Sequence, residues 1–64
     1  MRVNGQDIHL GEPCTLQTFL QREGYPLDRV AVELDGAIVP KSAFETIILK
    51  TCDRLEIVSF VGGG

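Results

Sequence analysis

The sequence predicts an α+β fold in which one main helix packs on one face of a mixed sheet of four to five strands. Three observations predict it. Apolar and polar residues alternate in four short segments, as they do in half-buried strands. One segment has the i, i+3, i+4 apolar spacing of an amphipathic helix. Asn4-Gly5 and Asp35-Gly36 are the residue pairs preferred in two-residue hairpin turns.

Residues 1–10 are predicted to form a β-hairpin around the Asn4-Gly5 turn. The alternation runs through residues 1–4 and again through residues 7–10. The apolar residues that this pattern places on the buried face are Met1, Val3, Ile8 and Leu10. The segment Gly11-Glu12-Pro13 ends the second strand.

Residues 15–23 are predicted to form the helix. Thr15 can cap it, because its hydroxyl can accept a hydrogen bond from the backbone N–H of Gln17 or Thr18. Gly24 occupies a C′ position and Pro26 prevents continuation. The apolar stripe is made by Leu16, Phe19 and Leu20, with Glu23 at the next helical position.

The second half of the chain is predicted to form two or three further strands. Residues 30–34 form a strand whose inward residues are Val30, Val32 and Leu34, and residues 38–39 follow the Asp35-Gly36 turn. Ser42 can cap a short helical turn over residues 43–45. Residues 46–49 are too few to separate a strand from a buried turn. Residues 53–61 form the last strand, with Leu55 and Ile57 inward.

This order of elements suits a β-grasp arrangement, in which the first and last strands lie parallel at the centre of the sheet. With 64 residues the chain forms a single domain, residues 1–61. Residues 62–64 then form a flexible glycine tail that leaves from a central strand.

Three consecutive glycines, Gly62, Gly63 and Gly64, follow the last predicted strand. A backbone without Cβ atoms can enter a slot too narrow for other residues. Three extended residues reach roughly 10 Å. The pattern therefore predicts a tail that carries the Gly64 carboxylate into a partner's active site. The alternative is a frayed terminus without a function.

Composition excludes several other functions. The net charge is −3 and the six Lys and Arg residues are scattered, so no nucleic acid partner is expected. No segment has the length and apolarity of a signal peptide or a membrane span. Cys14 and Cys52 are expected to be free thiols in a reducing cytoplasm. His9 is expected on the surface, and no group of residues suggests a catalytic or metal site.

Three segments together resemble one known family. These are Val3-Asn4-Gly5, residues 32–42 (VELDGAIVPKS) and residues 53–64 (DRLEIVSFVGGG). In this combination, over essentially the whole chain, the sequence resembles the ThiS family, the ubiquitin-like sulfur carriers of thiamine thiazole synthesis. Thr51-Cys52 stands where such proteins usually have an Asp-Gly turn.

The resemblance implies a co-substrate and not an enzyme. A ThiF-like adenylyltransferase would consume ATP to adenylate the Gly64 carboxylate, with Gly62 and Gly63 in its active site. Sulfur from a cysteine desulfurase or rhodanese route would then form a C-terminal thiocarboxylate. A ThiG-like thiazole synthase would take up that sulfur. The implied cycle needs no bound cofactor and no membrane.

Val58 and Phe60 are predicted to form a docking patch for the activating enzyme. If Leu55 and Ile57 point inward, alternation places these two apolar side chains on the open face of the sheet. Ordinary surface apolarity is the alternative. Three other functions stay open: a carrier for molybdopterin or another sulfur-transfer pathway, a ubiquitin-like modifier of lysines, and a binding module with an inert tail.

Overall fold

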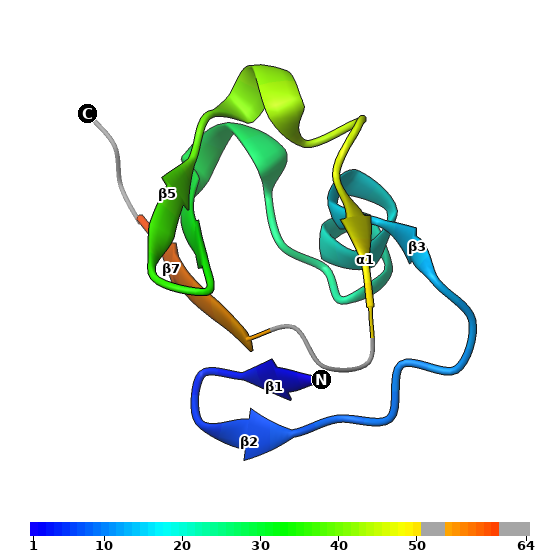
Figure 1. Cartoon of the computed structure of the whole chain (residues 1–64). Coiled ribbons are helices and arrows are strands. Elements are labelled where there is room, and N and C mark those ends of the chain that lie inside the picture. The colour runs from blue at the N-terminus through cyan, green and yellow to red at the C-terminus, as the bar shows by residue number, and fades with distance from the viewer. Residues whose placement is uncertain (51–53, 61–64) are drawn as a thin grey trace.

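A five-stranded mixed sheet forms one layer of the molecule, with the main helix on one side of it (Figure 1). The computed structural model describes residues 1–50 and 54–60. The strands of this sheet, in spatial order, are β2 (Gln6–Asp7), β1 (Arg2–Val3), β7 (Arg54–Ser59), β4 (Val30–Leu34) and β5 (Ala37–Val39). The predicted tail, residues 62–64, and the Thr51-Cys52 pair lie outside the described residues.

The strand pairing confirms the predicted β-grasp arrangement. β1 and β7 are parallel neighbours, with Val3 opposite Leu55, and every other pair in this sheet is antiparallel. β7 therefore has a partner on each side, β1 and β4. Backbone hydrogen bonds to both neighbours hold β7 in place, so the position of its last residue is well defined.

One helix, α1 (Leu16–Arg22), packs its apolar stripe into a single core with the sheet. The fully buried side chains include Leu16 and Leu20 from the helix and Val32 and Leu55 from the central strands. Two short 3₁₀ helices, η1 (Leu27–Arg29) and η2 (Lys41–Ala43), connect the elements. All core residues lie on one face of the five-stranded sheet, and its other face carries no described element.

Local sequence signals explain both ends of α1. The Thr15 hydroxyl accepts a hydrogen bond from the backbone N–H of Thr18 at 3.1 Å, as its N-cap assignment predicted. Gly24 adopts a φ of +84°, the left-handed conformation that commonly ends a helix. Glu23 is the C-cap residue and is exposed, so it does not extend the apolar stripe.

The two predicted hairpin turns are both present. Asn4 and Gly5 have φ values of 50° and 84°, and Asp35 and Gly36 have 50° and 88°. Positive φ at both central residues is the type I′ geometry, whose twist matches that of the flanking strands. Each turn thus joins a pair of antiparallel neighbours, β1 to β2 and β4 to β5.

Some predicted details were wrong or incomplete. Of the two alternatives left open for residues 46–49, the structure shows a strand, β6 (Ile48–Leu49). It pairs antiparallel with β3 (Cys14–Thr15) in a second, two-stranded sheet that was not predicted. Ser42 lies within η2 and does not cap it; the capping position is Pro40, without a side-chain hydrogen bond. Met1, Ile8 and Leu34, predicted on the buried face, are only half-buried. They lie at strand ends or next to the outer strand β2, where the core covers less of each side chain.

Candidate docking face and tail root

The side chains of β7 alternate between the core and the open face of the sheet. Leu55 and Ile57 are buried beneath it, at 0% and 5% exposure, whereas Val58 and Phe60 are 61% and 49% exposed. The predicted orientation of all four side chains is therefore confirmed. The docking function of Val58 and Phe60 stays a prediction.

The chain remains held for one residue beyond the end of β7. The backbone N–H of Phe60 donates a hydrogen bond to the carbonyl oxygen of Arg29 at 2.8 Å, next to β4. Phe60 is therefore the root from which residues 61–64 continue. Four residues span at most about 14 Å when extended, which sets how far from Phe60 a group that reacts with Gly64 can lie.

Asn4 holds β7 from the β1 side. Its backbone N–H donates to the carbonyl of Leu55 at 2.9 Å, and its side-chain Nδ2 donates to the carbonyl of Ile57 at 3.1 Å. The backbone N–H of Ile57 donates in turn to Asn4 Oδ1 at 2.7 Å. The side-chain amide thus continues the parallel ladder where the backbone of β1 has already turned away, and it satisfies groups that would otherwise be left unpaired.

Two substitutions of Asn4 separate the contribution of its side-chain amide to stability from that of its positive φ. Asn4→Gly keeps the positive φ but removes the amide, and we expect it to lower the free energy of unfolding by about 1–3 kcal/mol for the two hydrogen bonds. Asn4→Ala should cost about 1 kcal/mol more, because a Cβ is strained in the left-handed region. Urea denaturation measures both. Wild-type stability in Asn4→Gly would show that the amide bridge contributes nothing.

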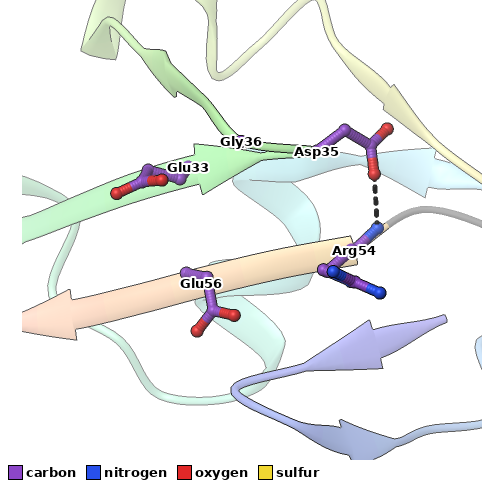
Figure 2. Close-up of a pocket in the computed structure, with 5 residues that line it drawn as sticks. All are labelled: Glu33, Asp35, Gly36, Arg54 and Glu56. Carbon is purple, nitrogen blue, oxygen red and sulfur yellow. Dashed lines mark hydrogen bonds between the residues drawn. The ribbon is translucent and has the colours of Figure 1, made fainter.

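Asp35 holds the start of β7 from the β4 side. Its backbone N–H donates to the carbonyl of Arg54 at 2.8 Å, and the backbone N–H of Arg54 donates to Asp35 Oδ1 at 3.0 Å (Figure 2). The two hairpin turns therefore each contribute a side chain that fixes β7. The strand before the predicted tail is anchored on both sides.

A shallow polar hollow lies on the open face above β4 and β7. Figure 2 shows the side chains of Glu33, Arg54 and Glu56 on these two strands; the lining residues are Glu33, Asp35, Gly36, Arg54 and Glu56. An adjoining hollow shares Arg54 and Glu56 and reaches Arg2 and Gly5. These residues were not singled out from the sequence, although the alternation that turns Val58 outward also turns Arg54 and Glu56 outward.

Other candidate chemistry is not supported by the part of the chain that the structure describes. Cys14 is a free, half-buried thiol on β3, and Cys52 lies outside the described residues. His9 is exposed, as predicted. Residues 1–50 and 54–60 contain no group of three or more His, Cys, Asp or Glu side chains that could hold a metal ion. Over the same ranges, no helix has the length and apolarity needed to cross a membrane.

The fold and the anchored last strand define a small ubiquitin-like β-grasp protein. The sequence matches the model of the ThiS family over residues 1–64. The chain belongs to the ThiS family.

Solved structures agree with this assignment. The crystal structure of the thiamine biosynthesis protein ThiS from Geobacter metallireducens superimposes with a TM-score of 0.77 and 29% identity, covering 98% of this chain and 96% of that one. A solution NMR structure of a thiamine biosynthesis protein from the same organism has a TM-score of 0.79 and 29% identity, over 98% of this chain and 85% of that one.

Two kinds of relatives are similar in sequence. The uncharacterized protein ycf40 of Pyropia yezoensis is 34% identical over 64 residues, which is 100% of this chain and 90% of that protein. A thiazole synthase of Paramagnetospirillum magneticum is 37% identical over 62 residues, which is 97% of this chain but only 19% of that enzyme. A sequence like this one therefore also occurs as a segment of a longer polypeptide.

Proposed function

We propose that this protein is the sulfur carrier of thiamine thiazole biosynthesis, with Gly64 as the residue that carries the sulfur. The observation that supports this most strongly is the match to the ThiS family over residues 1–64, which includes the glycines that follow β7. The anchoring of β7 by Asn4 and Asp35 supports it further, because a carrier must present its terminus from a defined position.

The proposed chemistry starts from the unreactive carboxylate of Gly64. A carboxylate is a poor acyl donor, because its leaving group would be an oxide. Attack of the carboxylate on the α-phosphate of ATP, in a ThiF-like partner enzyme, releases pyrophosphate and forms an acyl adenylate. A protein persulfide from a cysteine desulfurase or rhodanese route then displaces AMP and forms an acyl disulfide. A thiol reductant cleaves the S–S bond of that disulfide, which leaves the thiocarboxylate on Gly64 and joins the donor's sulfur to the reductant in a new disulfide. The sulfur stays bound to protein throughout, so free sulfide is not released.

Thiazole synthase is the proposed acceptor of this sulfur. The support is that two thiazole synthases, from Paramagnetospirillum magneticum and Magnetococcus marinus, each contain a segment similar to this chain. Joining a carrier to its acceptor raises the effective concentration of one for the other. We propose that this protein meets thiazole synthase in the cytoplasm, without binding a cofactor of its own.

Mass spectrometry tests the proposal directly. Incubation with the cognate activating enzyme, ATP and a sulfur source should raise the intact mass by about 16 Da, the replacement of one oxygen by sulfur. Fragmentation should place the added mass at Gly64. An unchanged mass together with no release of pyrophosphate would contradict the carrier function. A product joined to a lysine of another protein would instead indicate a ubiquitin-like modifier.

Neither cysteine thiol, Cys14 or Cys52, is expected to take part in this reaction. Cys14→Ser and Cys52→Ser should each gain the same mass at the same rate as the wild-type chain, because sulfur is proposed to bind the terminal acyl group and not a side chain. Time-resolved mass spectra of the three proteins measure this. Loss of sulfur acceptance in either variant would place a step of the transfer on that cysteine.

A further inference from the structure

The carbonyl that holds the tail root belongs to η1. The backbone N–H of Phe60 donates to the carbonyl of Arg29 at 2.8 Å, and Arg29 is the last residue of η1. This bond follows the final ladder pair of β4 and β7, which places Val30 opposite Ser59. The position from which residues 61–64 continue therefore depends on where η1 holds the Arg29 carbonyl.

The turn η1 has few interactions of its own. It is a single 3₁₀ turn, closed by a hydrogen bond from the Arg29 N–H to the carbonyl of Pro26 at 3.0 Å. None of its three residues is fully buried, and Pro26 provides no side-chain cap. Single 3₁₀ turns are weak, because their hydrogen-bond geometry is poorer than that of an α-helix. Contacts from elsewhere in the fold must therefore hold η1 in place.

Lys41 provides such a contact. Its Nζ donates a hydrogen bond to the carbonyl of Asp28 at 2.8 Å. Two successive carbonyls of η1, those of Asp28 and Arg29, thus accept from Lys41 and from the tail root. The Lys41 bond joins η1 to η2, and the two turns lie next to each other in Figure 1. A charged donor strengthens the bond, and lysine side chains commonly bind carbonyls near the end of a helix.

The turn η2 is held more firmly than η1. Phe44, directly after η2, is buried in the core, and its N–H donates to the carbonyl of Lys41 at 3.1 Å. The carbonyl of Phe44 accepts from the backbone N–H of Gln17 in α1 at 2.9 Å. The backbone of Lys41 therefore lies in a segment fixed to the core, whereas its ammonium group binds a turn that is not. The side chain passes that constraint to η1.

We propose that Lys41 is a positioning residue for the adenylation of Gly64: it fixes η1, and through the Arg29 carbonyl it fixes Phe60, the root of the tail. Adenylation is itself the proposed function, on which this inference rests. Lys41 acts through η1 and is assigned no contact with ATP or with the reacting carboxylate. Without its ammonium group, the core and the pairing of β7 persist, but the last hydrogen bond before the tail opens more often.

A looser root lowers the fraction of complexes in which Gly64 lies in attack geometry. Residues 61–64 span at most about 14 Å, so an extended tail has no spare length to compensate for movement of Phe60. The net contribution of one hydrogen bond corresponds to roughly a 3- to 10-fold change in such a local equilibrium. The effect should appear in kcat and not in KM, because the folded domain that the enzyme binds is unchanged.

Two variants of Lys41 test this by hydrogen exchange and kinetics. Lys41→Met keeps an aliphatic side chain without a donor, whereas Lys41→Arg keeps a positively charged donor. In the free protein, we expect the Phe60 amide to exchange about 3- to 10-fold faster in Lys41→Met, relative to the Ile57 amide, which Asn4 holds. Pyrophosphate release with the cognate adenylyltransferase should give a kcat lower by about the same factor and a KM within about twofold. Lys41→Arg should restore both readouts to within about twofold of the wild type.

Thr15→Ala is the matched control for lost stability. It removes the N-cap of α1, and Thr15 lies in β3, on the side of the molecule away from β7 (Figure 1). We expect its thermal midpoint to fall, while the ratio of Phe60 to Ile57 exchange and the kcat for adenylation stay at wild-type values. Lys41 is exposed, so Lys41→Met should remain folded. A merely structural function for Lys41 would give the Thr15→Ala pattern and would contradict the positioning role.

The possible outcomes separate Lys41 from the carrier function. If the wild-type chain releases pyrophosphate and Lys41→Met matches it in Phe60 exchange and kcat, Lys41 does not position the tail and the carrier function stands. A raised KM with unchanged Phe60 exchange would show that Lys41 contacts the enzyme directly, which also overturns the positioning role. If the wild-type chain releases no pyrophosphate with the enzyme and ATP, the carrier function is wrong, and the positioning of Gly64 for adenylation is wrong with it.

Discussion

Adding one alanine after Gly64 is expected to lower the rate of adenylation by roughly 100-fold or more, without changing thermal stability. The extra residue moves the terminal carboxylate by about 3.5 Å along the tail. Attack on the α-phosphate of ATP requires contact geometry, and a displacement of even about 1 Å can cost two orders of magnitude in rate. Pyrophosphate release measures adenylation, and a thermal scan measures stability.

A substitution within the tail tests the same mechanism without changing its length. Gly63→Val should also abolish adenylation, because a β-branched side chain does not fit a slot shaped for bare backbone. Gly62→Ala is the milder control, since Gly62 lies farther from the reacting carboxylate. Activation of the extended chain at the wild-type rate would show that the terminus is not the reactive group. An inert binding module would then be the better account of the protein.

Leu55→Asp is expected to unfold the domain. Leu55 is fully buried in the central strand β7, opposite Val3 on one side and Leu34 on the other. A carboxylate there would lose its hydration without gaining a partner, which costs several kcal/mol. That is comparable with the whole stability of a domain of this size, about 3–5 kcal/mol. Circular dichroism should show the loss of structure, and the milder Leu55→Ala should lower the free energy of unfolding by about 2–5 kcal/mol.

Phe60→Asp introduces the same side chain as Leu55→Asp, but at the residue after β7 and on the open face of the sheet. Phe60 is half-exposed and contributes little to the core, so the variant should keep the native circular dichroism spectrum. Its binding to the activating enzyme should weaken, because the proposed docking face loses its largest apolar side chain next to the tail root. A folded Leu55→Asp together with an unfolded Phe60→Asp would contradict the inward and outward assignment of β7.

Several features follow from the amino-acid sequence by itself, because short-range physics decides them. Asn4-Gly5 and Asp35-Gly36 adopt positive φ values that few other residue pairs tolerate, so the turns could be placed in advance. The ends of α1 are also set locally: the Thr15 side chain caps its N-terminus, and the positive φ of Gly24 ends it. The alternation along residues 54–58 correctly separated Leu55 and Ile57 from the outward side chains.

Other features were decided only by the tertiary structure. The pairing of β3 with β6 joins two-residue strands with no periodicity to read, and it depends on which segments the core brings together. The amide of Asn4 bonds to the backbone of Ile57, 53 residues away, and Glu33 meets Glu56 only through the register of β4 on β7. Such contacts depend on burial and on loop closure between distant segments, which no local preference encodes. The sequence therefore determined the main helix, the two hairpin turns and the inward and outward residues of the last strand. The tertiary structure decided the pairing of β3 with β6 and which charges lie side by side on the open face.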